Sequence, residues 1–268
     1  MTNRYEITFD ALKKRNEAAF IPFAVAGDPD PDKSEEIFRA YIDGGADILE
    51  IGYPFSDPIA DGPVNQRASQ RAIRNGMDHE KFFKLVKKLR SCSDIPVGIL
   101  LYANTILHLG TDLFCRKASD AGIDSILVAD MPPEESEVLQ SSMEKYGIGR
   151  VFIVSELTPQ NRIKYICSQI DSFVYVVSRL GATGTDLKFS DSISGTISRL
   201  KTETDKPLAV GFGISSAEHV RKVTQCGADG VIVGSALVKN IELSYKNANF
   251  LDKLREQVFD YKTATRTR

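Results

Sequence analysis

Runs of consecutive apolar residues recur along the whole chain, and most are followed by a stretch with the periodicity of an amphipathic helix. A run that is apolar at nearly every position is typical of a strand buried on both faces of a parallel sheet. Such strands are expected at 20–26, 46–51, 96–102, 124–129, 149–154, 173–177, 207–212 and 230–233. Eight strand–helix units in one undivided chain favour a closed (β/α)8, or TIM, barrel over an open sheet.

The intervening segments predict helices at 30–44, 112–121, 133–146, 159–170, 190–202, 216–225 and 249–261. A further helix at 5–16 precedes the first strand and is additional to the barrel. Barrels of this kind are typically about 250 residues long. The chain has 268 residues and no linker or low-complexity segment, so we expect residues 1–268 to form a single domain.

A short internal repeat supports the alternation of helices and strands. Gly45-Ala46-Asp47, Gly122-Ile123-Asp124 and Gly227-Ala228-Asp229 each stand between an expected helix and the next strand. Glycine can adopt the left-handed conformation that ends a helix, and aspartate is favoured in the turn that follows.

Composition excludes several classes of function. The 34 basic and 36 acidic residues nearly balance, and the basic residues are dispersed, so neither nucleic-acid nor membrane-surface binding is expected. The cysteines and histidines are scattered, which predicts no metal site and no disulfide framework. The N-terminus lacks an apolar signal region, and no window approaches about 20 apolar residues. We therefore expect a cytoplasmic location.

Polar side chains gather where the expected strands end. Glu50 ends the second strand and Asp61 follows in a loop stiffened by prolines, while Tyr175 lies in the sixth strand. In a (β/α)8 barrel the active site forms at the carboxyl ends of the strands. Two carboxyl groups in different environments can divide acid and base roles. The alternative is that Glu50 caps a strand and the aspartates only form turns.

Glycine-rich segments follow the last three expected strands, at 178–185, 211–215 and 234–236, and the last two are expected to open a helix and a helical turn, respectively. Glycine lets backbone N–H groups approach an anion closely, and a helix N-terminus favours negative charge. Phosphate sites of many barrels lie after strands seven and eight. The residues alone therefore predict an enzyme that binds a small phosphorylated substrate.

The stretch Leu49-Glu-Ile-Gly-Tyr-Pro-Phe-Ser-Asp-Pro-Ile-Ala-Asp-Gly-Pro63 closely resembles the signature of tryptophan synthase alpha subunits. Other segments are similar to the same family in the same order, and the likeness extends from Tyr5 to Arg266. These segments are 22–23, 27–29, 102–104, 128–132, 178–184, 211–215 and 234–236.

The resemblance implies a retro-aldol cleavage of indole-3-glycerol phosphate into indole and glyceraldehyde 3-phosphate. Glu50 would be the acid–base residue, and Asp61 would face the indole N–H and stabilise the charged indolenine intermediate. Tyr175 would assist near the glycerol hydroxyls, although a core aromatic is the alternative. Thr183 would bond Asp61 when the loop after the sixth strand closes.

The resemblance also assigns the substrate-binding residues. Phosphate would rest on backbone N–H groups of Gly184, Gly213, Gly234 and Ser235. The apolar slot for the indole ring would be formed by Phe23, Leu100, Leu127, Ala129 and Ile153, for which ordinary barrel packing is the alternative. The sequence departs from the family pattern at Tyr53, at Val64-Asn65 and at 155–159.

Members of the family work as an α2β2 heterotetramer, in which a beta subunit holds pyridoxal phosphate and receives the indole. No cofactor is expected in this chain. Pro54, Asp57 and Asn104 resemble the surface that faces the beta subunit. Two other functions stay open: an alpha subunit that has lost cleavage and only activates its partner, and another phosphate-binding barrel such as an epimerase.

Overall fold

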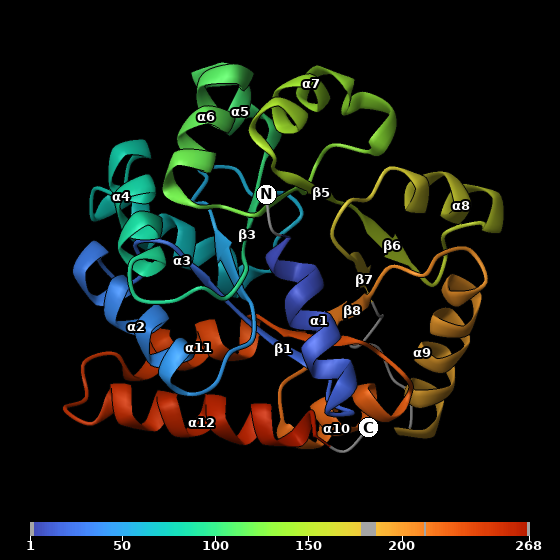
Figure 1. The fold of residues 1–268 in the computed structure, drawn as a ribbon. Helices are drawn as coiled ribbons and strands as arrows, with labels where there is room; N and C mark the ends of the chain where they lie inside the picture. The colour runs from blue at the N-terminus through green and yellow to red at the C-terminus, as the bar shows by residue number, and fades with distance from the viewer. Residues whose placement is uncertain (1–2, 178–185, 212, 267–268) are drawn as a thin grey trace.

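The computed structural model describes residues 3–177, 186–211 and 213–266, and its strands form one sheet of parallel strands (Figure 1). The strands are β1 Ala19–Val25, β2 Leu49–Gly52, β3 Val97–Leu101, β4 Ser125–Val128, β5 Gly149–Val151, β6 Ile153–Ser155, β7 Val174–Val177, β8 Leu208–Gly211 and β9 Gly230–Val233. Their order in the sheet is β5-β4-β3-β2-β1-β9-β8-β7-β6. The first strand therefore pairs with both β2 and β9, as it does in a barrel.

The sheet is a nearly closed barrel, because its two end strands are consecutive pieces of chain. The predicted strand 149–154 divides at Phe152 into β5, which pairs with β4, and β6, which pairs with β7. The carbonyl of Phe152 accepts a hydrogen bond from the N–H of Tyr175 at 3.1 Å, which holds the junction against β7. The other predicted strands lie within a few residues of their expected positions, and the predicted (β/α)8 barrel is confirmed.

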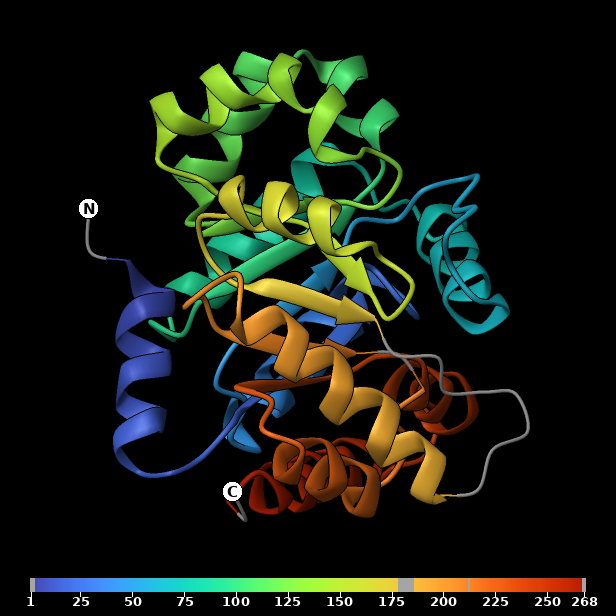
Figure 2. The same ribbon diagram turned by 90° about the vertical axis from the view of Figure 1, so that its right-hand side faces the viewer.

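The helices lie outside the sheet, α1 across one end of the barrel and the others around it (Figures 1 and 2). They are α1 Arg4–Lys14, α2 Pro31–Asp43, α3 Pro63–Arg74, α4 His79–Arg90, α5 Ala103–Leu109, α6 Thr111–Ala121, η1 Pro133–Glu135, α7 Glu137–Tyr146, α8 Gln160–Ser168, α9 Asp186–Lys201, α10 Ala217–Gln225, α11 Ser235–Ser244 and α12 Phe250–Ala264. No helix was predicted at α3, α4 or α5, and only the first turn of α11 was predicted.

The repeated Gly–x–Asp segments have the predicted conformation and a further role. Each glycine has a positive φ, at +99° for Gly45, +86° for Gly122 and +92° for Gly227. Each aspartate then accepts a hydrogen bond from a backbone N–H at the start of a neighbouring strand. The bonds run from Phe20 to Asp47 at 2.7 Å, from Val97 to Asp124 at 2.8 Å and from Leu208 to Asp229 at 3.0 Å.

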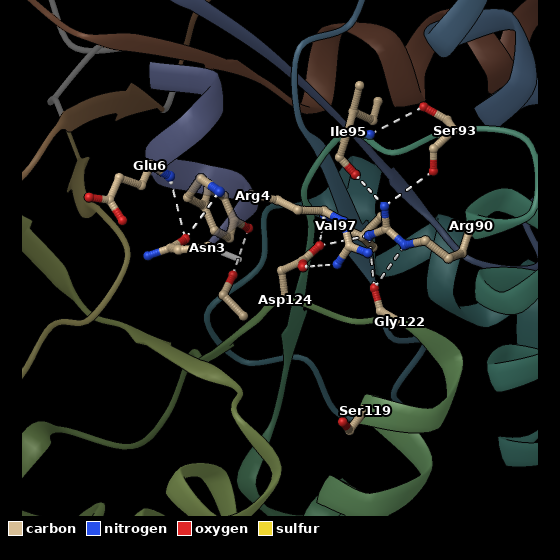
Figure 3. A network of polar contacts seen from close by, with 12 residues as sticks. Asn3, Arg4, Glu6, Arg90, Ser93, Ile95, Val97, Ser119, Gly122 and Asp124 are labelled. Carbon is tan, nitrogen blue, oxygen red and sulfur yellow. Dashed lines mark hydrogen bonds and ion pairs between the residues drawn. The ribbon is translucent and has the colours of Figure 1, made fainter. Parts of the chain in front are cut away.

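The N-terminal helix α1 lies across the end of the barrel where the strands begin, and β6 and β7 point away from it (Figure 2). Asp124 holds α1 in place through one of its oxygens, which accepts a hydrogen bond from Arg4 at 2.8 Å, while the other accepts from Arg90 at 2.7 Å (Figure 3). The Tyr5 hydroxyl lies 2.7 Å from the hydroxyl of Ser125 inside the barrel. The opposite end of the barrel is left for a binding site.

Candidate active site

A cavity of about 380 Å³ lies among residues at the carboxyl ends of the strands. Glu50, Asp61 and Tyr175 border it, together with residues from the predicted phosphate loops and indole slot. The predicted site residues on its wall are Phe23, Glu50, Asp61, Leu100, Ala129, Ile153, Tyr175, Gly213, Gly234 and Ser235. The structure therefore brings these residues together around one space.

Glu50 lies in β2, where it pairs in register with Phe23 of β1 and Gly98 of β3. Glu50 is only 6% exposed to solvent. Burial, and secondarily the nearby Asp61 carboxylate, raise the pKa of Glu50 to about 8. A carboxyl group with this pKa carries a proton at neutral pH, so Glu50 can act first as an acid and then as a base.

Asp61 lies in the loop between β2 and α3. Its Oδ2 accepts a hydrogen bond from the hydroxyl of Tyr102 at 3.0 Å, and its Oδ1 accepts one from Asn65 Nδ2 at 3.3 Å. Burial raises the pKa of Asp61, and these two hydrogen bonds oppose the rise. Tyr102 also accepts a hydrogen bond from the N–H of Ala60 at 3.1 Å, which ties the loop to the end of β3.

Tyr175 lies in β7, in register with Ile153 and Ala209. Burial raises the pKa of its phenol well above the usual value, and the charges of Glu50 and Asp61 add to the rise. The phenol therefore stays protonated and can donate a hydrogen bond. A side chain on Gly211 would meet the Tyr175 hydroxyl at 2.9 Å, so the glycine makes room for it.

The predicted anion site combines a helix N-terminus with glycines. Gly234 is the N-cap of α11, and its carbonyl accepts the first bonds of the helix from Leu237 and Val238. The N–H groups of Ser235 and Ala236 have no acceptor within the helix. Gly213 has a φ of +74°, a conformation that favours glycine. No lysine or arginine stands among the described residues of the cavity wall, so backbone N–H groups and the helix dipole would have to bind an anion.

Some predicted residues lie elsewhere. Leu127 borders a separate small cavity deeper in the barrel, with Tyr5 and Phe173. Thr183 and Gly184 lie outside the described residues. Conversely, the cavity wall includes two polar residues that were not predicted as site residues, Tyr102 and Asn65. The position of Tyr102 at the end of the third expected strand was the available signal, whereas nothing in the sequence indicated that Asn65 bonds Asp61.

The loop after β2 also carries part of the predicted partner surface. Asp57 and Asn104 are exposed, and Ile59 is 82% exposed. Pro54 is buried in this structure.

Two general features of the described residues bear on function. Across residues 3–177, 186–211 and 213–266, no group of three or more His, Cys, Asp or Glu side chains could hold a metal ion. Within the same part of the chain, no helix combines the length and apolar character needed to cross a membrane.

A barrel with two carboxyl groups, an apolar wall and a helix N-terminus at its mouth defines an enzyme that acts on a small phosphorylated substrate with an apolar part. Residues 9–266 match the family model described as tryptophan synthase alpha chain. The chain belongs to this family. The family's reaction is the cleavage of indole-3-glycerol phosphate to indole and glyceraldehyde 3-phosphate, so the chain is a carbon–carbon lyase of tryptophan biosynthesis.

Individual relatives agree with the family model. The tryptophan synthase alpha chain of Methanothermobacter thermautotrophicus is 47% identical over 85% of both chains, and that of Methanoregula boonei is 44% identical over 98% of this chain and 99% of its own. The solved alpha subunit from Legionella pneumophila is 31% identical, covers 99% of each chain and has a TM-score of 0.91. Members of the family work with a beta subunit, to which pyridoxal phosphate belongs.

Proposed function

We propose that Glu50, Asp61 and the N-terminus of α11 act together on one molecule of indole-3-glycerol phosphate. The observation that carries this proposal is that all three border a single cavity at the carboxyl ends of the strands. The cavity also has an apolar wall, so it suits a substrate with an aromatic ring at one end and a phosphate at the other.

In the proposed chemistry, Glu50 first donates a proton to the substrate and then accepts a proton from it. Protonated Glu50 donates to C3 of the indole ring, which gives a positively charged indolenine whose N–H faces the Asp61 carboxylate. The Glu50 carboxylate then takes the proton of the adjacent glycerol hydroxyl. The carbon–carbon bond breaks, its electron pair restores the aromatic ring, and the hydroxyl carbon becomes the aldehyde of glyceraldehyde 3-phosphate. A fixed anion beside the developing cation lowers the barrier.

The remaining residues would bind and orient the substrate. The phenol of Tyr175 donates to the glycerol hydroxyls, and the N–H groups of Gly213, Gly234 and Ser235 hold the phosphate. Phe23, Leu100, Ala129 and Ile153 enclose the ring, while Leu127 supports it from the layer below. Gly184 would add its N–H group to the phosphate site, and Thr183 would bond Asp61 when the loop after β7 closes.

The assembly is also part of the proposal. We infer that residues 1–268 form one domain, that the chain binds no cofactor of its own, and that it forms a cytoplasmic α2β2 heterotetramer with a beta subunit. The exposed Asp57 and Ile59 in the loop after β2, the exposed Asn104, and Pro54 of the same loop as Asp57 would form the contact with the beta subunit.

The direct test supplies the purified chain and a beta subunit with indole-3-glycerol phosphate and follows release of glyceraldehyde 3-phosphate. The wild-type chain is expected to release it. Glu50→Gln should abolish turnover, because an amide cannot donate and accept the proton, and Asp61→Asn should lower turnover by a factor of about 100 or more. Both variants should still raise the activity of the beta subunit. A wild-type chain that activates its partner without releasing product would identify a catalytically silent subunit instead.

A further inference from the structure

Asn65 borders the cavity, and only one of its two polar side-chain atoms has a hydrogen-bond partner. Its Nδ2 donates to Oδ1 of Asp61 at 3.3 Å. Its Oδ1 is buried and accepts no hydrogen bond, and it is the single buried side-chain polar atom in this condition among the described residues. Buried polar atoms are rarely left without partners, because each one loses its bonds to water on folding.

Reversing the amide does not remove the problem. The reversed orientation would direct the Asn65 oxygen at a carboxylate oxygen and leave the amide nitrogen without an acceptor. With Asp61 ionised, only the observed orientation is attractive. The contact with Asp61 therefore determines how the amide lies, and the unsatisfied oxygen is a consequence of that contact.

The geometry of Asp61 shows what the contact achieves. Tyr102, at the end of β3, bonds one carboxylate oxygen, and Asn65, in the first turn of α3, bonds the other. Two donors on different elements fix the plane of a carboxylate that would otherwise rotate. Each oxygen keeps a free lone pair, so a ligand N–H can still bond to it.

We propose that Asn65 is a positioning residue, which holds the Asp61 carboxylate in the plane needed to meet a ring N–H. In this orientation the side-chain oxygen of Asn65 is left without a hydrogen-bond partner. This inference rests on the proposed role of Asp61. It predicts that the loss of Asn65 harms turnover more than the fold, because the hydrogen bond lost to Asp61 is offset by the removal of a buried oxygen that has no partner.

The main test is Asn65→Leu, which keeps the size of the side chain and removes both its donor and its unsatisfied oxygen. We expect kcat to fall about tenfold with a much smaller change in KM, and the melting temperature to change little, because the lost hydrogen bond and the removed unpaired oxygen act in opposite directions. Gln70→Leu is the matched control, since Gln70 is exposed on the same helix, and it should keep the wild-type kcat. Unchanged turnover in Asn65→Leu, or a lower melting temperature with normal turnover, would reject the proposal.

The pH profile separates positioning from a purely structural role. The titratable groups that face Asp61 are Glu50 on β2 and the phenols of Tyr102 and Tyr175, and raised pKa values keep both phenols neutral. The Asn65 hydrogen bond lowers the pKa of Asp61, so its loss raises that pKa. The acid limb of kcat should therefore move to higher pH in Asn65→Leu. An acid limb at the wild-type position would contradict the proposal.

Asn65→Asp provides a second variant of similar size that replaces the donor with a carboxylate. Its turnover should fall at least as far as that of Asn65→Leu, because two carboxylates then face each other. Full activity in this variant would overturn the proposal even if Asn65→Leu did not fold. Asp61→Asn is measured in parallel: a severe loss there with a normal Asn65→Leu rejects only the role of Asn65, whereas a mild loss rejects the role of Asp61 as well.

Discussion

Glu50 and Asp61 differ in what surrounds each carboxyl group. Burial raises the pKa of both carboxyl groups. Hydrogen bonds from Tyr102 and Asn65 oppose the rise for Asp61, whereas the charge of Asp61 adds to the rise for Glu50. The surroundings of Glu50 thus favour its neutral acid form, whereas the two hydrogen bonds to Asp61 favour its carboxylate form. This separation assigns the proton transfers to Glu50 and the electrostatic role to Asp61.

The pKa of Glu50 has a consequence for stability. Its value of about 8 in the folded chain lies above its ordinary value of 4.5, so between these values the folded chain holds a proton that the unfolded chain releases. The contribution of Glu50 to stability therefore falls as pH rises through this window. We expect Glu50→Gln to be more stable than the wild type at pH 9, by up to about 4 kcal/mol, and the difference to shrink by pH 5. Urea denaturation at both pH values measures it, and equal differences would contradict a raised pKa.

At the scale of single residues, the sequence predicted the positions that depend on strand ends. Glu50, Gly234 and Ser235 follow from where a strand stops, whereas Asp61 was predicted from the proline-stiffened loop after the second strand. Leu127 shows the limit: it pairs in register with Leu100, yet only Leu100 borders the main cavity. Strands in a barrel are tilted, so residues in register can lie at different depths, and no local pattern reveals that tilt.

Among the elements, α3 and α11 are joined by charged side chains near the active site. Arg71 of α3 bonds both oxygens of Asp28, at 2.7 and 3.0 Å, and also Glu242 of α11 at 2.7 Å. Arg67 bonds both oxygens of Glu242 at 2.8 Å. Helix α3 follows the loop of Asp61 and α11 begins at Ser235, so these bonds connect the two halves of the proposed site.

The side chain of Asp28 is only 1% exposed, and Arg71 neutralises its charge. Removing Arg71 should therefore destabilise the folded chain. We expect Arg71→Met to lower the free energy of unfolding by about 3 kcal/mol, because it leaves a buried carboxylate unpaired. Arg67→Met, on the more exposed end of the same network, should cost less. Adding Asp28→Asn to Arg71→Met should recover part of the loss. Chemical denaturation of the set measures this, and equal losses for the two arginine variants would contradict the buried pair.

The helices show why some elements were predicted and others were not. Helix α4 was not predicted, although it buries Phe82, Phe83, Val86 and Leu89 at a helical spacing that the sequence displays. Helix α3 buries only Ala68, Ser69 and Ala72, and so small an apolar stripe gives a weak signal. Its position becomes clear only through the contacts with α11 and the loop of Asp61.

The whole molecule divides stability and chemistry between the two ends of the barrel. At the end where the strands begin, α1 is held by the Asp124 network (Figures 2 and 3). The cavity lies at the other end, among the loops that follow the strands. The alternation of strands and helices predicted this architecture, because it depends on apolar patterning. The closure at Phe152 was not predicted, since it depends on which strand each half of 149–155 pairs with.

Asp124→Ala tests this division. It removes the acceptor of Arg4, Arg90 and the N–H of Val97, so we expect the free energy of unfolding to fall by about 3 kcal/mol. Turnover per folded molecule, measured well below the melting temperature, should stay within about twofold of wild type, because changes at this end of a barrel affect stability. A large loss of kcat in a fully folded variant would show that the two ends are coupled.

The central claim is that a proton donor, an anion and a phosphate site act on one substrate molecule. A crystal structure with an analogue of indole-3-glycerol phosphate that lacks the reacting hydroxyl tests it most directly. We predict that the ring N–H lies within hydrogen-bond distance of Asp61, that Glu50 faces C3 of the ring, and that the phosphate bonds N–H groups of Gly234 and Ser235. An analogue bound with its phosphate at α11 but its ring out of reach of both Glu50 and Asp61 would contradict the account.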